Sequence, residues 1–125
     1  MLTVIEAIAH MEGFYVPGSR AARNLNPGNL NFAPWLAKKY GAVLETTMFV
    51  VPPEHPRFAR FKTVEDGKDA IRTLLTNPPY EGKSLSGIFN IYAPPSENQT
   101  NTYTAFVAHE TGLSPDAVPT AAEIG

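Results

Sequence analysis

Three proline pairs limit the length of every regular element that this chain can form. They lie at Pro52-Pro53, Pro78-Pro79 and Pro94-Pro95, among twelve prolines in 125 residues. Proline lacks an amide donor and clashes with the preceding helical turn, so neither a helix nor a central strand can run through such a pair. We therefore expect short elements joined by tight turns, packed around one core in a single domain spanning residues 1–125.

Composition excludes several classes of protein. Hydrophobic residues make up 43% and charged residues 18% of the chain, which is typical of a globular protein. The absence of cysteine excludes disulfides, a thiol nucleophile and thiolate metal ligands. A formal charge of −2 argues against a nucleic-acid partner. Because no segment resembles a membrane span, we expect no membrane insertion. Because no segment resembles an export signal either, we expect the protein to be delivered by a route that the chain does not itself encode.

Hydrophobic spacing predicts a mainly α-helical α+β fold with a small antiparallel sheet. Residues 13–31 are expected to form a structured loop, in which the Pro27-Gly28 pair requires a positive backbone angle at the glycine. The expected helices cover residues 2–12, 63–76, 84–91 and 101–111, and the expected strands cover residues 42–51 and 57–62, with residues 30–32 as a further partner.

Glu12 is the most informative single residue of the sequence. In a helix it would share a face with Ile5 and Ile8, which lie seven and four positions earlier. Desolvation on such a face disfavours the ionised carboxylate, as a general acid requires. The alternative is that Glu12 belongs to a buried structural network or to the end of the helix.

The histidines indicate surface positions rather than a metal site. Glu6 and His10 lie one turn apart on the opposite helical face, and a third ligand is missing at metal-binding spacing. His55 and His109 are also interpreted as surface residues. No metal or organic cofactor is expected.

Two polar segments are rich in amide side chains. The first runs from Arg23 to Leu30 around Asn26-Pro27-Gly28-Asn29, and the second runs from Tyr92 to Thr100. Asparagine can bond its own backbone in turns, and Ser96 to Thr100 can cap the helix that follows. The alternative is that both segments present amide and aromatic groups to a carbohydrate. The two interpretations are compatible.

This arrangement resembles the lysozyme-like superfamily, in particular small phage and bacterial proteins with an Arg-Asn-x-Asn-Pro-Gly-Asn-Leu loop. In those proteins a catalytic Glu ends an early helix, as Glu12-Gly13 would here, and a later Ala-Pro-Pro-x-Glu-Asn stretch leads into a tyrosine-bearing helix, as residues 93–103 would. The resemblance covers most of the chain in the same order. Two departures are that Gly13 replaces the usual serine and that a second catalytic carboxylate is not evident, although Asp66 and Glu97 are candidates.

The resemblance implies an enzyme that cleaves the β-1,4 bond between N-acetylmuramic acid and N-acetylglucosamine in bacterial peptidoglycan. Glu12 would be the general acid, in a cleft between its helix and the sheet, and the protein would act as a monomer on glycan strands of the cell wall, in the periplasm or outside the cell. The residues implied in positioning and substrate contact are Arg23, Asn26, Asn29, Tyr92, Glu97, Asn98 and Tyr103.

Two other classes of function remain open from the sequence. One is a non-catalytic wall-binding or structural component of a phage particle or secretion apparatus that keeps the fold, which the net negative charge and the missing second carboxylate favour. The other is a metal-dependent peptidase or amidase. Among enzymatic mechanisms, a lytic transglycosylase needs only one carboxylate, whereas glycoside hydrolases use two.

Overall fold

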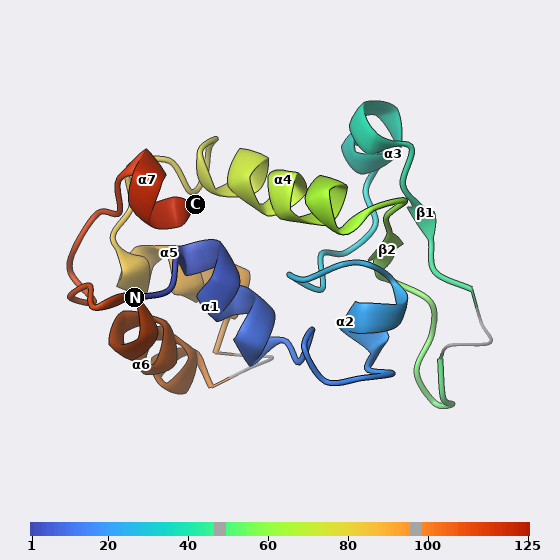
Figure 1. Cartoon of the computed structure of the whole chain (residues 1–125), viewed down its shortest axis with the longest axis horizontal. Coiled ribbons are helices and arrows are strands. Elements are labelled where there is room, and N and C mark those ends of the chain that lie inside the picture. Colours follow the sequence, from blue (N-terminus) through green and yellow to red (C-terminus); the bar gives the residue numbers. More distant parts are fainter. Residues whose placement is uncertain (47–49, 96–98) are drawn as a thin grey trace. The chain divides into compact units, whose positions relative to one another are not determined.

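The computed structural model describes residues 1–46, 50–95 and 99–125. Within this part the protein is mainly helical with a two-stranded antiparallel sheet, which confirms the expected α+β class (Figure 1). No helix of the described residues has both the length and the apolar character needed to cross a bilayer. The elements are α1 (Val4–Met11), α2 (Arg20–Arg23), α3 (Pro34–Tyr40), β1 (Val43–Leu44), β2 (Ala59–Arg60), α4 (Val64–Leu75), α5 (Leu85–Tyr92), α6 (Thr100–Thr111) and α7 (Ala121–Ile124).

The chain divides into two compact units. The first unit combines Met1–Met11 with Arg72–Gly125, so it holds both ends of the chain, and the second is the continuous segment Glu12–Ile71. Helix α4 passes from the second unit into the first. Its start was predicted correctly, because Thr63 Oγ1 accepts a hydrogen bond of 3.1 Å from the Asp66 amide.

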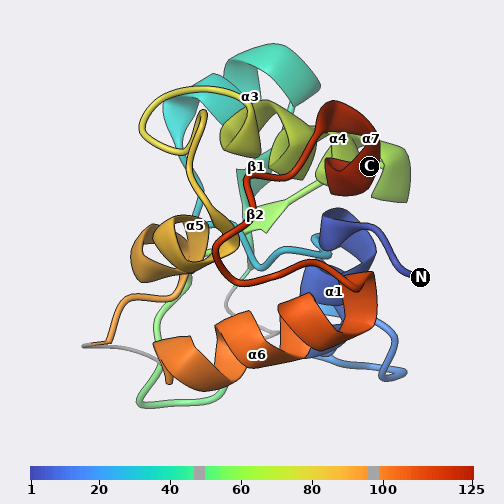
Figure 2. The ribbon, with the colours of Figure 1, turned by 90° about the vertical axis from the view of Figure 1, so that its left-hand side faces the viewer.

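The first unit contains helices α1, α5, α6 and α7 and the last turn of α4. Helix α6 packs against α1 and α5, and α7 packs against α1 (Figure 2). The expected helices α5 and α6 are confirmed, since Ser84 Oγ caps α5 by accepting from the Gly87 amide and Gly112 ends α6 with a φ of 73°. The core of this unit is built from apolar side chains that include Val4, Ile5, Ile8, Leu85, Ile88, Phe89, Val107 and Ile124.

The sheet of the second unit is smaller than the sequence suggests. Val43 pairs with Arg60 and Leu44 with Ala59, while the rest of the expected strands is irregular or, at residues 47–49, outside the described part. The expected third partner is present as a single bridge between Asn31 and Phe58. The buried charge of Glu45 directly after β1 interrupts the apolar pattern, and Pro52, Pro53 and Pro56 lie between the two segments, so the long strands expected over residues 42–51 and 57–62 were wrong in extent.

Three short helices were not expected. Helix α2 lies inside the segment interpreted as a loop, where Ser19 Oγ accepts from the Ala22 amide over 3.1 Å. Helix α3 runs from Pro34 to Tyr40 and is followed by the C-cap Gly41, whose φ is 66°. Helix α7 is closed by a capping box between Thr120 and Glu123. Capping residues mark the starts of α2 and α7, and Pro34 marks the start of α3, but segments of four to seven residues are too short for periodicity to reveal.

Candidate functional site

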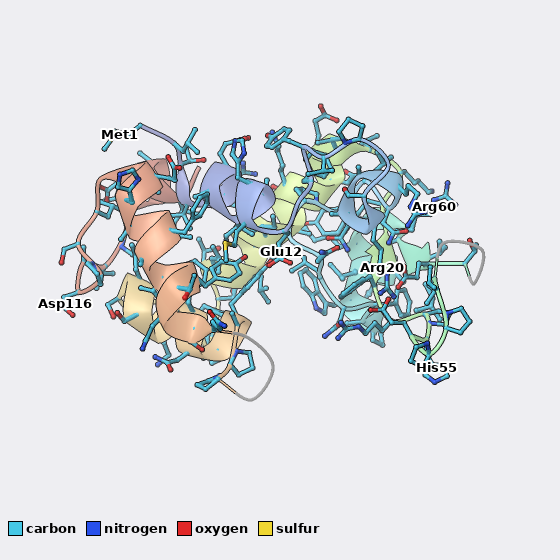
Figure 3. The ribbon with its side chains drawn as sticks, turned by 90° about the horizontal axis from the view of Figure 1, so that it is seen from below. Met1, Glu12, Arg20, His55, Arg60 and Asp116 are labelled. Carbon is cyan, nitrogen blue, oxygen red and sulfur yellow. The ribbon has the colours of Figure 1, made fainter. Side chains whose placement is uncertain are left out.

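Glu12 is the first residue after α1, whereas the sequence predicted that it lies in the last turn of this helix. Gly13 follows with a φ of 76° and turns the chain away from the helix axis. The side chain of Glu12, which Figure 3 labels, is half-buried, and its Oε1 accepts a hydrogen bond of 3.2 Å from Nδ2 of Asn29. The structure therefore joins the candidate acid to one of the asparagines that the sequence had singled out.

Asn26 holds the shape of the loop that carries Asn29. Its side chain is fully buried, with Oδ1 accepting from the Leu30 amide at 2.9 Å and Nδ2 donating to the carbonyls of Leu30 at 3.0 Å and Ala59 at 2.8 Å. Every polar atom of the side chain is therefore used inside the protein. Any contribution of Asn26 to a binding site comes through the shape of the loop.

The positive backbone angle of this turn falls one residue later than expected. The amide of Asn29 donates to the Asn26 carbonyl over 3.1 Å, which closes a β-turn with Pro27 and Gly28 at its centre. It is Asn29 that takes the left-handed conformation, with a φ of 47°, so the expectation for Gly28 was wrong. Asparagine tolerates the left-handed conformation better than most residues with a Cβ, which explains why Asn29 can adopt it.

A buried ion pair lies elsewhere in the second unit and was not predicted. The side chain of Glu45 is completely buried, and its two oxygens accept five hydrogen bonds. Its ion-pair partner is Arg20, which is labelled in Figure 3. Arg20 donates through Nε at 2.9 Å and Nη2 at 2.6 Å, Asn24 through Nδ2 at 3.0 Å, and the amides of Arg57 and Phe58 at 3.0 and 2.9 Å. This network fastens α2 to the segment that enters β2.

The electrostatics of the network keep Glu45 ionised. Burial alone would raise the pKa of this carboxyl group, but the hydrogen bonds from Arg20, the Arg57 and Phe58 amides and Asn24 outweigh it and lower the pKa from 4.5 to about 2. Arg20 also pairs with the exposed Glu54 at 2.6 Å and stacks over the Phe58 ring at 4.4 Å. The only sign of this network in the sequence was a single carboxylate, Glu45, within an apolar run. That pattern does not indicate which residues bind the carboxylate.

The acidic residues near the sheet have structural roles. Glu45 accepts five hydrogen bonds within the network of Arg20. Asp69 Oδ2 accepts a hydrogen bond of 2.7 Å from the Tyr40 hydroxyl. Asp66 lies in the first turn of α4 behind its Thr63 cap. Glu97, the other candidate for a second carboxylate, lies outside the described residues, as does Asn98.

The candidate aromatic residues meet in the first unit. Tyr92, the last residue of α5, and Tyr103 of α6 have ring centroids 6.1 Å apart. Tyr103 is buried and stacks on Phe89 at 4.8 Å, and Tyr80 approaches Tyr92 at 6.4 Å. Burial raises the pKa of Tyr80. Tyr92 is half-buried and is the more accessible of the two candidates.

The remaining candidates lie near the surface. Arg23 is exposed at the end of α2, and His10, His55 and His109 are exposed as expected. Among the described residues, His, Asp and Glu nowhere gather in a group of three that could hold a metal ion. Compared with known proteins, the chain matches no family model, no curated protein and no solved structure.

Proposed function

We propose that this protein is a lysozyme-like enzyme that cleaves peptidoglycan glycan strands, with Glu12 as the general acid. The observation that carries the proposal is the hydrogen bond from Asn29 Nδ2 to Glu12 Oε1. It links the half-buried carboxyl group to the Asn-Pro-Gly-Asn loop, and these are two of the features on which the resemblance to this superfamily rests. A general acid must be held in a fixed place beside the leaving oxygen, and a rigid loop donor serves that purpose.

A one-carboxylate mechanism suits this proposal best. Glu12 donates its proton to the oxygen of the leaving sugar, and the carboxylate then removes the proton of the muramic acid 6-hydroxyl as that oxygen bonds to the anomeric carbon. The glycosidic bond breaks, a 1,6-anhydro ring forms and no water is consumed. Glu45 is a poor candidate for a second catalytic group, because the hydrogen bonds that keep it ionised also occupy both its oxygens.

The distribution of charge removes an objection to an anionic substrate. The net charge of −2 for the whole chain suggests repulsion from wall polymers. However, residues 12–71 contain eight basic and six acidic residues, a formal charge of +2, and the other unit carries −4. The unit that contains Glu12 is therefore the one that an anionic glycan approaches more favourably.

The proposal is tested by clearing of purified cell walls. Glu12→Gln should keep the fold and lower the rate by at least ~100-fold, the lower end of what a positioned general acid contributes. Glu6→Gln, the same change in the first turn of α1, serves as the matched control and should retain activity. Equal activity of wild type and Glu12→Gln would refute the assignment. Binding to walls without any cleavage by the wild type would identify a non-catalytic wall-binding protein, and loss of activity on chelation would point to a metal-dependent enzyme.

A further inference from the structure

The two polar atoms of the Asn29 side chain have different surroundings. Nδ2 donates to Glu12 Oε1 at 3.2 Å. Oδ1 is buried and accepts no hydrogen bond from any residue that the structure describes. Buried carbonyl oxygens in proteins are nearly always hydrogen-bonded, so an unsatisfied one beside a candidate catalytic acid is open to a donor that the described residues do not provide.

The orientation of this amide is constrained by its neighbours. While the Glu12 carboxyl group is ionised, exchanging Nδ2 and Oδ1 would place the carbonyl oxygen against a carboxylate oxygen, and two acceptors repel each other. The backbone also cannot shift easily, because Asn29 is held at a φ of 47° in a turn that buried Asn26 pins to β2. Helix α4 adds a further restraint, since Gly67 lies so close to the Leu25 carbonyl that a Cβ there would be 2.5 Å from the oxygen.

We infer that Asn29 divides its side chain between two tasks: the nitrogen positions Glu12, and the carbonyl oxygen accepts a hydrogen bond from the sugar bound beside that acid. The inference rests on the proposed function for the identity of the ligand. It requires a ligand that donates at this point, and the N–H of a 2-acetamido group is the donor that distinguishes wall glycans from other β-1,4 glucans. Asn29 is thus a positioning residue for catalysis and a specificity residue for binding.

Binding is measured in the Glu12→Gln background, in which the ligand is not consumed, with N-acetylchitotriose as the probe and cellotriose as its 2-hydroxyl counterpart. Asn29→Gly keeps the left-handed backbone without strain and removes both polar atoms. It should weaken chitotriose binding by about five- to tenfold, as expected for the loss of one neutral hydrogen bond. Asn29→Asp keeps an acceptor oxygen and should bind chitotriose within about twofold of the parent.

The turnover of walls by the single variants then separates the two tasks. Asn29→Asp replaces the donor to Glu12 with a second acceptor, so it should lower kcat while leaving KM nearly unchanged, whereas Asn29→Gly should affect both. A purely structural residue would not divide the two constants in this way, and melting temperatures verify that both variants are folded.

Each outcome has a separate meaning. A loss in Asn29→Gly that is confined to chitotriose supports an acetamido donor, and an equal loss with cellotriose supports a hydroxyl donor in its place. Unchanged binding in Asn29→Gly overturns the inference alone, since it would mean that the oxygen makes no hydrogen bond to the sugar, and it leaves the role of Glu12 standing. If the Glu12→Gln parent binds neither sugar and the wild type cleaves no wall, the proposed function fails and the inference fails with it.

Discussion

Arg20 and Glu45 form a two-point ion pair across 25 residues of sequence, with Nε to Oε1 at 2.9 Å and Nη2 to Oε2 at 2.6 Å. The pair is joined by Asn24 and by two backbone amides, so the carboxylate is saturated with donors. A buried charge is tolerated only when it is paired and hydrogen-bonded in this way. The second unit therefore depends on one polar cluster as well as on its apolar core.

Acid should destabilise the protein through Glu45. Because its pKa is lowered to about 2 in the folded state, its contribution to stability is fully present above the unfolded value near 4.5 and is lost as the pH falls toward 2. The contribution amounts to about 3 kcal/mol at neutral pH. Urea unfolding between pH 7 and pH 2 should show this decline, and a free energy of unfolding independent of pH below 5 would contradict it.

Removing the charge of Glu45 should be costly at neutral pH. Glu45→Gln leaves Arg20 without its buried partner, and we expect a loss of about 3–5 kcal/mol in the free energy of unfolding. Glu54→Gln is the matched control, because Glu54 contacts the same arginine with a side chain that is 58% exposed, and it should cost less than about 1 kcal/mol. Similar losses in the two variants would show that burial is not what makes the pair important.

Gly67→Ala should destabilise the protein although alanine favours helices. A Cβ at Gly67 would lie 2.5 Å from the Leu25 carbonyl oxygen and 2.7 Å from Pro27 Cδ, both on a loop that cannot easily yield. Overpacking of this kind costs about 1–3 kcal/mol, which exceeds the gain of about 1 kcal/mol in helix propensity. Gly87→Ala in α5 is the control, because its closest neighbour is a Lys83 side-chain atom at 3.2 Å. In thermal unfolding, Gly67→Ala should have a lower melting temperature than Gly87→Ala.

The products of wall digestion should reveal the mechanism. If Glu12 acts without a second carboxylate, mass spectrometry will find 1,6-anhydromuramyl ends. Reducing muramic acid ends with one added water would instead establish hydrolysis. That result would require a second carboxylate, at about 5 Å for retention or roughly 6.5–9.5 Å for inversion of configuration.

The sequence by itself determined the elements that depend on local signals. Periodic apolar residues, Ser and Thr caps and terminal glycines were sufficient to predict α1, α4, α5 and α6 to within a few residues, because these signals act within one or two helical turns. The same local signals marked the Asn-Pro-Gly-Asn segment as a tight turn. They placed its positive angle on Gly28, where local preference favours it, and the structure has it at Asn29.

Only the tertiary structure decided what the polar residues do. Asn26 and Asn29 look equivalent in the sequence, yet one is sealed against β2 and the other reaches Glu12. Glu45 was invisible as an ion-pair partner because its donors come from α2 and from the segment before β2. Hydrogen bonds between residues 17 to 33 positions apart depend on how the chain folds back on itself, and no periodic pattern along the sequence records that path.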